Sequence, residues 1–405
     1  MAISQGIFKK TILGRQVSKG TLAPVGVGAI MRRESSTFEL AKESYTTESE
    51  ITSTQQVTSS RHGVRLVNGK LTGILSPGTY ADALSAVLRR DFAAVTPIAS
   101  ASITIAGAGP TYTLTRAAGS FLTDGIKIGM PVRLTAGTFN VANLNKNLLV
   151  VSVTATILTV MVINTTALVA EGPITGATVT VPGKVTYTPV TGQTNIYHTV
   201  EEWYPDVPFS ERNIDVKFTQ ANLSLPGTGN AKIDFTAIGL NQTSLSTAYF
   251  TAPTAETSTE SLVAASGVLL VGGVAQAIIT DLSVNIDGKG AAADGVVGTD
   301  IRPDVFTGKV TVSGSFTAYF ADATLPGLFV NETATSIVSA LAAGTAANAD
   351  VMTLTMSNAR LNSSTPADAE TGQKRTYNYV AILNAAGGAG IATEKTSLMV
   401  CDSAA

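Results

Sequence analysis

The sequence predicts a mainly β protein, and three observations carry that prediction. Threonine, valine, alanine, serine and glycine recur along the chain. Valine and threonine favour pleated strands, and glycine marks turns and bulges. Short alternating apolar runs are separated by turn residues. Apolar residues make up 44% and charged residues 14% of the 405 residues, which excludes a disordered chain and allows two or three cores.

The first 57 residues show little apolar periodicity, and threonine and serine cluster between Ser35 and Ser60. We expect an extended N-terminal arm or long loop that is ordered by its neighbours. Two basic pairs, Lys9-Lys10 and Arg32-Arg33, lie in this region. Nucleic-acid contact is one role for them, but the net charge of −2 favours ion pairs between subunits or simple solvation.

The following segment predicts a hairpin and then a helix. Asn68-Gly69 is typical of a two-residue turn, and strand-like runs flank it on both sides. After the turn residues Ser76-Pro77-Gly78-Thr79, apolar side chains fall at helical spacing. We therefore expect an amphipathic helix that begins at Tyr80 and ends near Phe92.

Between Pro97 and Pro189 the chain has few charges and much threonine, valine and glycine, so we expect a small all-β domain inserted at residues 98–187. Its uncharged stretch at residues 148–170 is long enough to span a bilayer. The polar and β-branched residues within that stretch favour two strands instead, Leu149–Val153 and Ile157–Ile163.

The rest of the chain predicts a second β region behind a linker, Thr251–Ser261. We expect a turn at Pro226-Gly227, a hairpin turn at Gly272-Gly273 and a second helix at Thr333–Ala342. The remaining predicted strands are Thr199–Trp203, Ile214–Phe218, Lys232–Ile238, Gly267–Val271, Ala277–Ile286, Val310–Phe320 and Val351–Met356.

These observations predict three parts. Residues 1–97 with 188–250 form a first module, residues 98–187 are inserted in it, and residues 251–405 form a second module. The order of elements at residues 64–88 is echoed at residues 309–341, and Ala221–Gly227 is similar to Thr280–Gly288. The echo leaves open whether the second module duplicates the first.

No motif predicts a catalytic, cofactor or metal site, so we expect a protein that is not an enzyme. Ala106–Pro110 is glycine-rich but runs into a predicted strand, unlike a dinucleotide-binding loop. The two histidines, His62 and His198, lack the spacing of metal ligands. One cysteine, Cys401, excludes an internal disulfide framework, which suggests assembly in a reducing cytoplasm.

Several polar and aromatic residues allow more than one role. Glu201-Glu202 could serve acid–base work, but adjacent strand residues point to opposite faces, so one solvated and one interfacial carboxylate is expected. Asp300 and Asp304 could coordinate calcium, although ordinary loop polarity explains them more simply. Trp203-Tyr204 could anchor an interface or pack in a core.

The segment Arg61–Leu84, with Leu75, Ser76, Pro77, Gly78, Thr79 and Tyr80 at its turn, resembles the major tail tube proteins of long-tailed, siphovirus-type bacteriophages. Later pieces are similar as well: Val200–Glu202, Ala221–Gly227, Ile279–Ile286 and Val310–Tyr319. The resemblance covers most of the chain outside residues 98–187. Only the turn motif is specific, and we take its six residues as the candidate assembly segment.

The resemblance implies a β-sandwich or half-barrel with a flanking helix, whose sheets join those of neighbouring subunits. Stacked rings would form a channel through which DNA is ejected without specific binding. The implied partners are further copies of the chain, a tape measure protein and the tail terminator and tip proteins, with no membrane involved. The implied location is the virion tail, assembled in the host cytoplasm, with the inserted domain on the tube exterior.

If both modules carry the tube fold, three chains complete a ring with pseudo-sixfold symmetry, which we prefer; otherwise six chains are needed. Two alternatives stay open. A secreted, surface-layer or adhesin-type protein would need a signal peptide, and residues 1–20 lack a continuous apolar region. A carbohydrate-binding β-protein would need clustered exposed aromatics, which make up only 6% of the chain.

Overall fold

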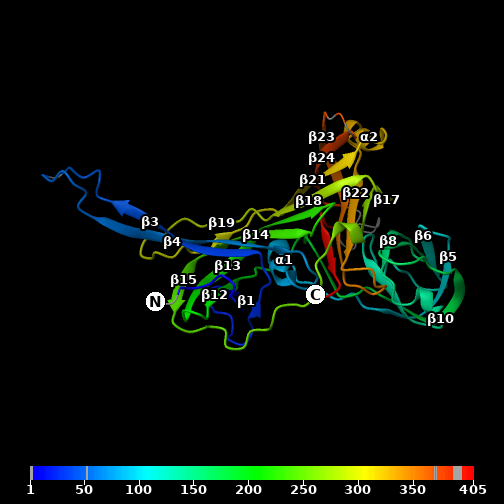
Figure 1. The fold of residues 1–405 in the computed structure, drawn as a ribbon, viewed down its shortest axis with the longest axis horizontal. Coiled ribbons are helices and arrows are strands. Elements are labelled where there is room, and N and C mark those ends of the chain that lie inside the picture. The colour runs from blue at the N-terminus through cyan, green and yellow to red at the C-terminus, as the bar shows by residue number, and fades with distance from the viewer. Residues whose placement is uncertain (1–2, 52, 369, 371, 386–394) are drawn as a thin grey trace.

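The computed structural model describes residues 3–51, 53–368, 370, 372–385 and 395–405. Almost all of its regular structure is antiparallel strand, with two short α-helices. The predicted mainly β class is therefore confirmed. Figure 1 shows a long sheet from which the hairpin β3–β4 projects at one end, with a separate group of strands at the other end.

Two successive parts of the chain contain the same order of elements, and we call them the first and second repeats. The elements of the first repeat are β1 (Lys10–Arg15), β2 (Ala29–Ile30), β3 (Ser35–Thr46), β4 (Ser60–Ile74), α1 (Ala81–Leu88), β12 (His198–Tyr204), β13 (Phe209–Pro226), β14 (Lys232–Gly239) and β15 (Asn241–Leu245). Those of the second repeat are β16 (Gly267–Val271), β17 (Val274–Ala275), β18 (Ile279–Asp287), β21 (Thr311–Tyr319), α2 (Thr324–Val330), β22 (Thr335–Ala342), β23 (Val351–Pro366), β24 (Lys374–Ala381) and β25 (Met399–Asp402).

The two repeats also pair their strands in the same way. The first repeat has the order β2–β1–β12–β13–β14–β4–β3, with β15 also on β13. The second has β17–β16–β22–β23–β24–β21–β18, with β25 also on β23. Every strand of one repeat thus has a counterpart with the same neighbours in the other.

Two irregularities of the pairing also recur. The register shifts between His198 and Val200 on β12, and between the counterpart residues Thr335 and Ile337 on β22. It shifts again after Phe218 on β13 and after Leu361 on β23. Because bulges are specific features and not random defects, their recurrence aligns the two repeats residue by residue.

A six-stranded closed barrel interrupts the first repeat between α1 and β11 (Lys184–Tyr187). Its strands are β5 (Ile98–Ala106), β6 (Thr111–Arg116), β7 (Pro131–Ala136), β8 (Leu148–Val153), β9 (Ile157–Val162) and β10 (Glu171–Thr180). The uncharged stretch at residues 148–170 contributes β8 and β9, as predicted. Among the residues described, no helix has the length and apolar character needed to cross a membrane. The minor elements are η1 (Val141–Asn143), η2 (Ala264–Ser266), β19 (Ala291–Ala292) and β20 (Val305–Phe306).

The barrel has its own core and also covers one face of the second repeat (Figure 1). Leu149 and Met161 of the barrel pack against Leu270 and Val338 of β16 and β22. On the matching face of the first repeat, Phe250 packs against Ile12 of β1. The outer faces of both repeats are therefore covered within the chain, but by different segments.

Several sequence predictions are confirmed. The first predicted helix is α1, and the Gly272-Gly273 turn joins β16 to β17. Strand β13 ends at Pro226, and the Gly-rich Ala106–Pro110 segment is the turn between β5 and β6. No helix or strand occurs at residues 251–261, the predicted linker.

Two predictions near the N-terminus are wrong. Residues 10–46 are not mainly an arm, because β1, β2 and β3 lie within the sheets. Strand β1 pairs with β12, which follows the barrel in the sequence. Asn68-Gly69 is not a turn, because β4 runs straight through it. Gly69 is needed for packing instead: a Cβ atom there would lie 2.4 Å from Cε1 of Phe38.

The second predicted helix is also wrong. Residues 335–342 form the strand β22, and the helix α2 precedes it at Thr324–Val330. Strand β22 is buried on both faces, and a doubly buried strand gives a continuous apolar run that cannot be told from a buried helix by periodicity. Pro326-Gly327 within α2 reads as a turn in the sequence.

Candidate assembly interface

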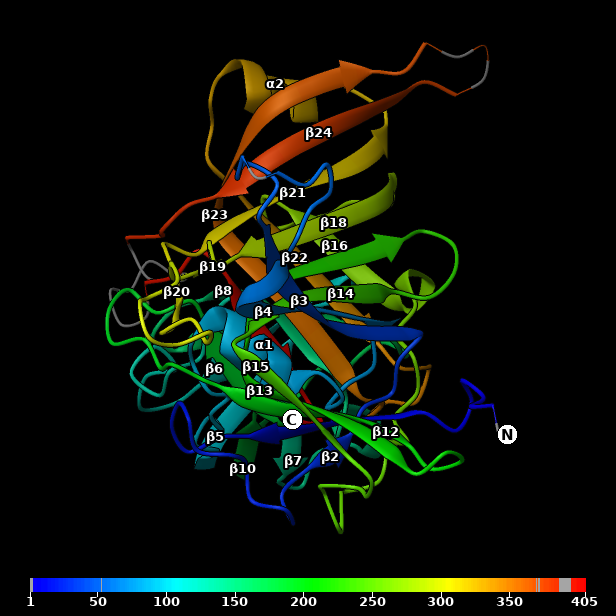
Figure 2. The same cartoon turned by 90° about the vertical axis from the view of Figure 1, so that its left-hand side faces the viewer.

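The two repeats are joined by strand pairing. The second half of β13 pairs with β14 on one side and with β18 on the other, from Gln220 opposite Asp287 to Pro226 opposite Asp281. This pairing makes one continuous sheet from β3 to β24, and Figure 2 shows its strands side by side. One apolar core runs beneath both repeats. We call the β13–β18 contact the internal joint.

The similarity of Ala221–Gly227 to Thr280–Gly288 has a structural meaning other than duplication. These segments belong to β13 and β18, which pair with each other and are not counterparts. Both alternate apolar and polar residues because each has one face on the core and one face away from it.

The linker strengthens the internal joint. Leu262 is fully buried; its N–H donates to the carbonyl of Leu75 (2.9 Å) and its carbonyl accepts from the N–H of Ala231 (2.9 Å). Oγ1 of Thr259 donates to the carbonyl of Pro77 (2.7 Å), and Arg32 donates to the carbonyl of Thr259 (2.6 Å). The start of the second repeat is thus held between β4 and β14 of the first.

The six residues of the candidate assembly segment lie at this contact. Leu75, Ser76 and Tyr80 are buried, and the N–H of Gly78 donates to the Asp402 carboxylate (2.8 Å) at the end of β25. The Tyr80 hydroxyl donates to the carbonyl of Arg32 (2.8 Å), and burial raises the pKa of Tyr80 to about 12. Residues 75–80 therefore contact the linker, the N-terminal region and the C-terminal strand of the same chain.

Gly78 has a backbone conformation that other residues avoid. Its φ is +76°, and a Cβ atom would lie 2.8 Å from the carbonyl oxygen of Ala404. Both facts favour glycine, because only glycine adopts such a φ without a steric cost. The turn is thereby held close to the C-terminus.

The helices of the two repeats differ in exposure. All of residues 83–88 in α1 are buried, and α1 packs against β13 and β18 beneath the internal joint. In α2 only Leu325 is buried, and Val330 at its end is 74% exposed. Helix α2 packs against β23, which has no second strand on the outer edge of its residues 360–366 in the part of the chain that is described.

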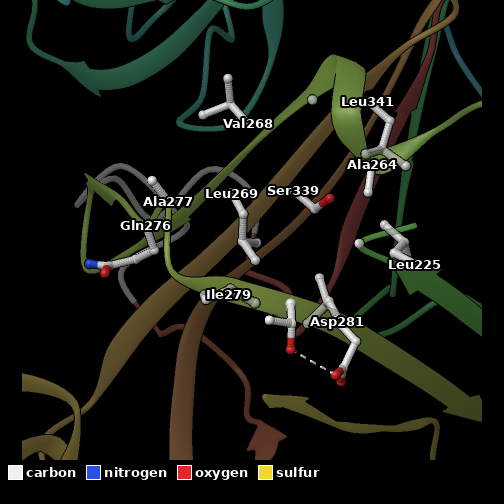
Figure 3. A pocket seen from close by; sticks show the side chains of 14 residues that line it. Leu225, Ala264, Val268, Leu269, Gln276, Ala277, Ile279, Asp281, Ser339 and Leu341 are labelled. Carbon is white, nitrogen blue, oxygen red and sulfur yellow. Dashed lines mark hydrogen bonds between the residues drawn. The ribbon is translucent and has the colours of Figure 1, made fainter. Parts of the chain in front are cut away.

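A shallow pocket lies at one end of the internal joint (Figure 3). Leu225 of the first repeat and Leu269, Ile279 and Leu341 of the second line it. At the matching place in the first repeat, charged side chains fill the space. Nζ of Lys9 lies 2.7 Å from the Glu202 carboxylate, and Arg33 donates to the carbonyl of Lys9.

The basic pairs of the N-terminal region are thus mostly engaged within the chain. Lys9 and Arg33 belong to this charged cluster, and Arg32 binds the linker. Both Glu201 and Glu202 are buried, so the prediction of one solvated carboxylate is wrong. The reason is that β12 is covered on both faces: Glu201 accepts hydrogen bonds from the N–H groups of Tyr249 (2.5 Å) and Phe250 (3.0 Å).

The other sequence candidates lie apart from one another. His62 is exposed, whereas His198 is buried with Nε2 2.8 Å from the Asp82 carboxylate. Asp300 pairs with Arg65, and Asp304 accepts from the Tyr197 hydroxyl (2.8 Å). Within the described residues, no three His, Cys, Asp or Glu side chains come together as a metal site.

The aromatic residues of β12 and of the barrel pack against other parts of the chain. Trp203 and Tyr204 are half-buried, with Nζ of Lys9 5.6 Å from the centre of the Tyr204 ring. In the barrel, Tyr112, Phe121 and Phe139 are all buried. The rings on which a sugar could stack are therefore inside the barrel core.

The internal joint was not predicted from the sequence. Its only signal was the similar alternation of β13 and β18, because cross-strand pairing depends on residues about 60 positions apart (Gln220 and Asp287, for example). Comparison with known proteins adds one finding. The family model described as phage tail tube protein matches residues 13–381, which include the barrel and both repeats except the start of β1 and the strand β25. No curated protein matches the chain.

Proposed function

We propose that this chain, which belongs to the phage tail tube protein family, assembles with copies of itself into stacked rings that form the channel for DNA ejection. Membership in that family makes it a structural protein of the virion tail. The proposed partners beyond its own copies are a tape measure protein and the terminator and tip proteins of the tail. Assembly takes place in the host cytoplasm.

The observation that carries the proposal is a repeated sheet that is open at both ends. Strand β3 pairs only with β4, and residues 360–366 of β23 pair only with β24, among the described residues. Open strand edges attract further strands, and closure into a ring removes them. Two repeats per chain support a ring of three chains with six similar units.

We further propose that residues 1–97 with 188–250, and residues 251–405, are two tube modules. The matching strand orders and bulges described above support this division. The barrel packs on the side of β16 and β22 that faces away from the shared core. Its position supports a place for residues 98–187 on the tube exterior.

The face of the long sheet that points away from the core is the proposed channel wall. Alternation assigns that face from the buried residues on each strand. Its uncharged members are mainly Thr37, Thr72, Asn222, Ser224, Thr236, Ser283, Asn285, Ser313, Ser315, Thr317 and Asn378. The hydroxyl and amide groups of these residues are wettable and carry no charge.

The charges on the same face balance. Acidic Glu39, Asp234, Asp281 and Asp287 stand against basic Lys70, Lys232, Arg360 and Lys374. Tight binding of DNA requires clustered cations that release counterions from the phosphates. A wall with equal numbers of both signs supports passage of DNA without retention.

Electron microscopy of the purified protein over a range of concentrations tests the proposal. Hollow tubes or rings with an open lumen are the expected result. Compact monomers at every concentration would contradict it and return attention to a surface-protein role. A retention assay adds a control: tubes should bind no DNA, whereas tubes of Asn222→Lys should retain it at low salt. An added lysine on the barrel surface, Thr175→Lys, should not cause the lumen of the tubes to retain DNA.

A further inference from the structure

We propose that neighbouring copies join in the register of the internal joint, with β23 of one copy pairing antiparallel to β3 of the next. In this external joint Ser363, Ser364, Thr365 and Pro366 stand opposite Ala41, Leu40, Glu39 and Phe38 of the next copy. The inference rests on the proposed function and specifies the contact that closes the ring.

The register follows from the counterparts in the two repeats. The shared bulge makes Leu361 of β23 the counterpart of Phe218 of β13. Gly69 of β4 and Gly314 of β21 are counterparts, so Phe38 opposite Gly69 corresponds to Val284 opposite Gly314. The Asn222–Asn285 pair of the internal joint then becomes Thr365–Glu39 between copies.

Neither edge pairs with a second strand among the described residues, although the carbonyl of Phe38 accepts from Nε2 of Gln242 (3.3 Å). Glu39 on β3 and Thr365 on β23 are exposed. The N–H of Ala367 donates to the carbonyl of Lys374 on the β24 side (2.9 Å), so the neighbouring Pro366 faces the open edge. A proline is tolerated on an edge because no donor is needed there until the joint forms. The external joint has one fewer hydrogen bond than the internal joint at that position.

The exposure of α2 points to the same partner. Helix α1 is buried because β18 and its neighbours complete the sheet above it. Helix α2 lies under β23, where the next copy would place β3. The exposed Val330 and the partly buried Leu328 and Phe329 give α2 an apolar surface that a docked β3 would cover.

The N-terminal segment of the next copy is the counterpart of the chain that follows the linker and enters β16. Strand β1 corresponds to β16, so residues 3–8 correspond to residues 261–266, which include η2, and Ser4 is the counterpart of Leu262. Leu262 lies beside Leu75 and Ala231, where the N–H of Leu75 donates to the carbonyl of Ala231 (2.8 Å). In the second repeat the same bond joins the N–H of Phe320 to Gln373 (2.9 Å), and Phe320 is 48% exposed. Ile3 and Ile7, both more than four-fifths exposed, supply apolar groups to cover it.

Disulfide trapping tests the register. The N–H of Gly288 donates to the carbonyl of Thr219, and the N–H of Gly227 donates to the carbonyl of Thr280. These backbone hydrogen bonds place the Asn222–Asn285 pair at a non-hydrogen-bonded position of the antiparallel ladder. Side chains there are close enough for a disulfide. We expect oxidised tubes of Glu39→Cys/Thr365→Cys to run as covalent dimers and trimers without reductant. These residues lie on opposite edges of one chain, so no internal disulfide competes.

Two matched variants control the result. Asn222→Cys/Asn285→Cys should lose its two introduced thiols and still run as a single chain, because the pair lies within one chain. Glu39→Cys/Ser364→Cys should give at least tenfold less covalent dimer, because adjacent strand residues point to opposite faces. The natural Cys401 is fully buried and common to all variants.

A second measurement uses the unmodified protein. Amide hydrogen exchange should slow in β3 and in residues 360–366 when monomers assemble, whereas β13 and β18 should be protected in both states. Rings that form with no cross-link between positions 39 and 365 and no new protection of these strands would overturn the external joint and leave the proposed function intact. The absence of any ring would overturn both.

Discussion

Gly69 and Gly314 occupy counterpart positions in β4 and β21, and at each the missing side chain makes room for a neighbour. A Cβ atom on Gly69 would lie 2.4 Å from the Phe38 ring, and one on Gly314 would lie 2.0 Å from the carbonyl oxygen of Ser283. Both glycines stand in straight strands. Their role is close packing, which explains why an Asn-Gly pair here is not a turn.

Gly69→Ala should therefore destabilise the chain. Because the new methyl group must displace the buried ring of Phe38, we expect the free energy of unfolding to fall by about 1–3 kcal/mol. Urea denaturation measures the change. Gly26→Ala is the matched control, since nothing lies within 4 Å of its Cβ position, and its effect should stay within about 0.5 kcal/mol. Equal effects of the two substitutions would contradict the packing argument.

Asp82 in the first turn of α1 gives the stability a pH dependence. Burial alone would raise the pKa of this carboxyl, but the hydrogen bond and charge of His198 and the charge of Arg15 lower it below 3.8. A lowered pKa means that the stabilisation is complete above the unfolded-state value and is lost as the pH falls through the folded-state value. Asp82→Asn should flatten the loss of stability in acid.

Thermal unfolding at several pH values between 2 and 6 measures this effect. The wild-type chain should lose stability more steeply with acid below the ordinary aspartate pKa of 3.8 than Asp82→Asn does. Asp294→Asn, at an exposed position, should keep the wild-type slope. Parallel profiles for Asp82→Asn and the wild type would show that the His198 contact carries no pH-dependent stability.

Residue roles were predicted from the sequence only where they depend on near neighbours. The turn chemistry of Ser76-Pro77-Gly78-Thr79 is local, and it was read correctly. The burial of Glu201 depends on residues 249–250, which arrive from the far end of the first repeat. Such tertiary contacts leave no signal in the residues that flank Glu201.

At the scale of elements, the difference between α1 and β22 shows what periodicity can decide. Helix α1 follows a clear turn and has an amphipathic pattern, so it was predicted with its start within one residue. Strand β22 is buried on both faces between the core and the barrel, so polar residues do not mark its period. The barrel strands β8 and β9 were recognised because serine and threonine interrupt their apolar runs.

The start of the linker depends on one buried carboxylate. Glu201 accepts hydrogen bonds from Ser210 (2.5 Å) and from the N–H groups of Tyr249 and Phe250, and Phe250 closes the outer core on Ile12. Glu201→Gln replaces a charged acceptor with a weaker one that also carries two donors. We expect a loss of about 1–3 kcal/mol in stability, because hydrogen bonds to charged groups exceed neutral ones.

Limited digestion with chymotrypsin shows which segment of the chain is destabilised in Glu201→Gln. Cleavage next to Tyr249 and Phe250 should be faster in Glu201→Gln than in the wild type. Glu256→Gln changes an exposed carboxylate in the same linker and should cleave at the wild-type rate. Unchanged cleavage in Glu201→Gln would mean that other contacts hold the linker in place.

For the whole molecule, the repeated sheet explains why one chain can supply two units of a ring. The repeats share strand order and bulge positions, yet few of their counterpart residues are identical; Phe235 corresponds to Tyr377, and Leu71 to Phe316. The sequence therefore showed only a weak echo, since backbone pairing is preserved by any residues of suitable size and polarity. The mainly β class and the family were predictable, and the internal joint was not.

The number of chains in a ring tests the account most directly. Cryo-electron microscopy of assembled tubes, viewed along the axis, counts the barrels that project from the outer wall. Three projections per ring around a wall of six similar units are expected, since each chain has two repeats and one barrel. Six projections around a wall of twelve units, or six chains that each place only one repeat in the wall, would contradict the paired-repeat account.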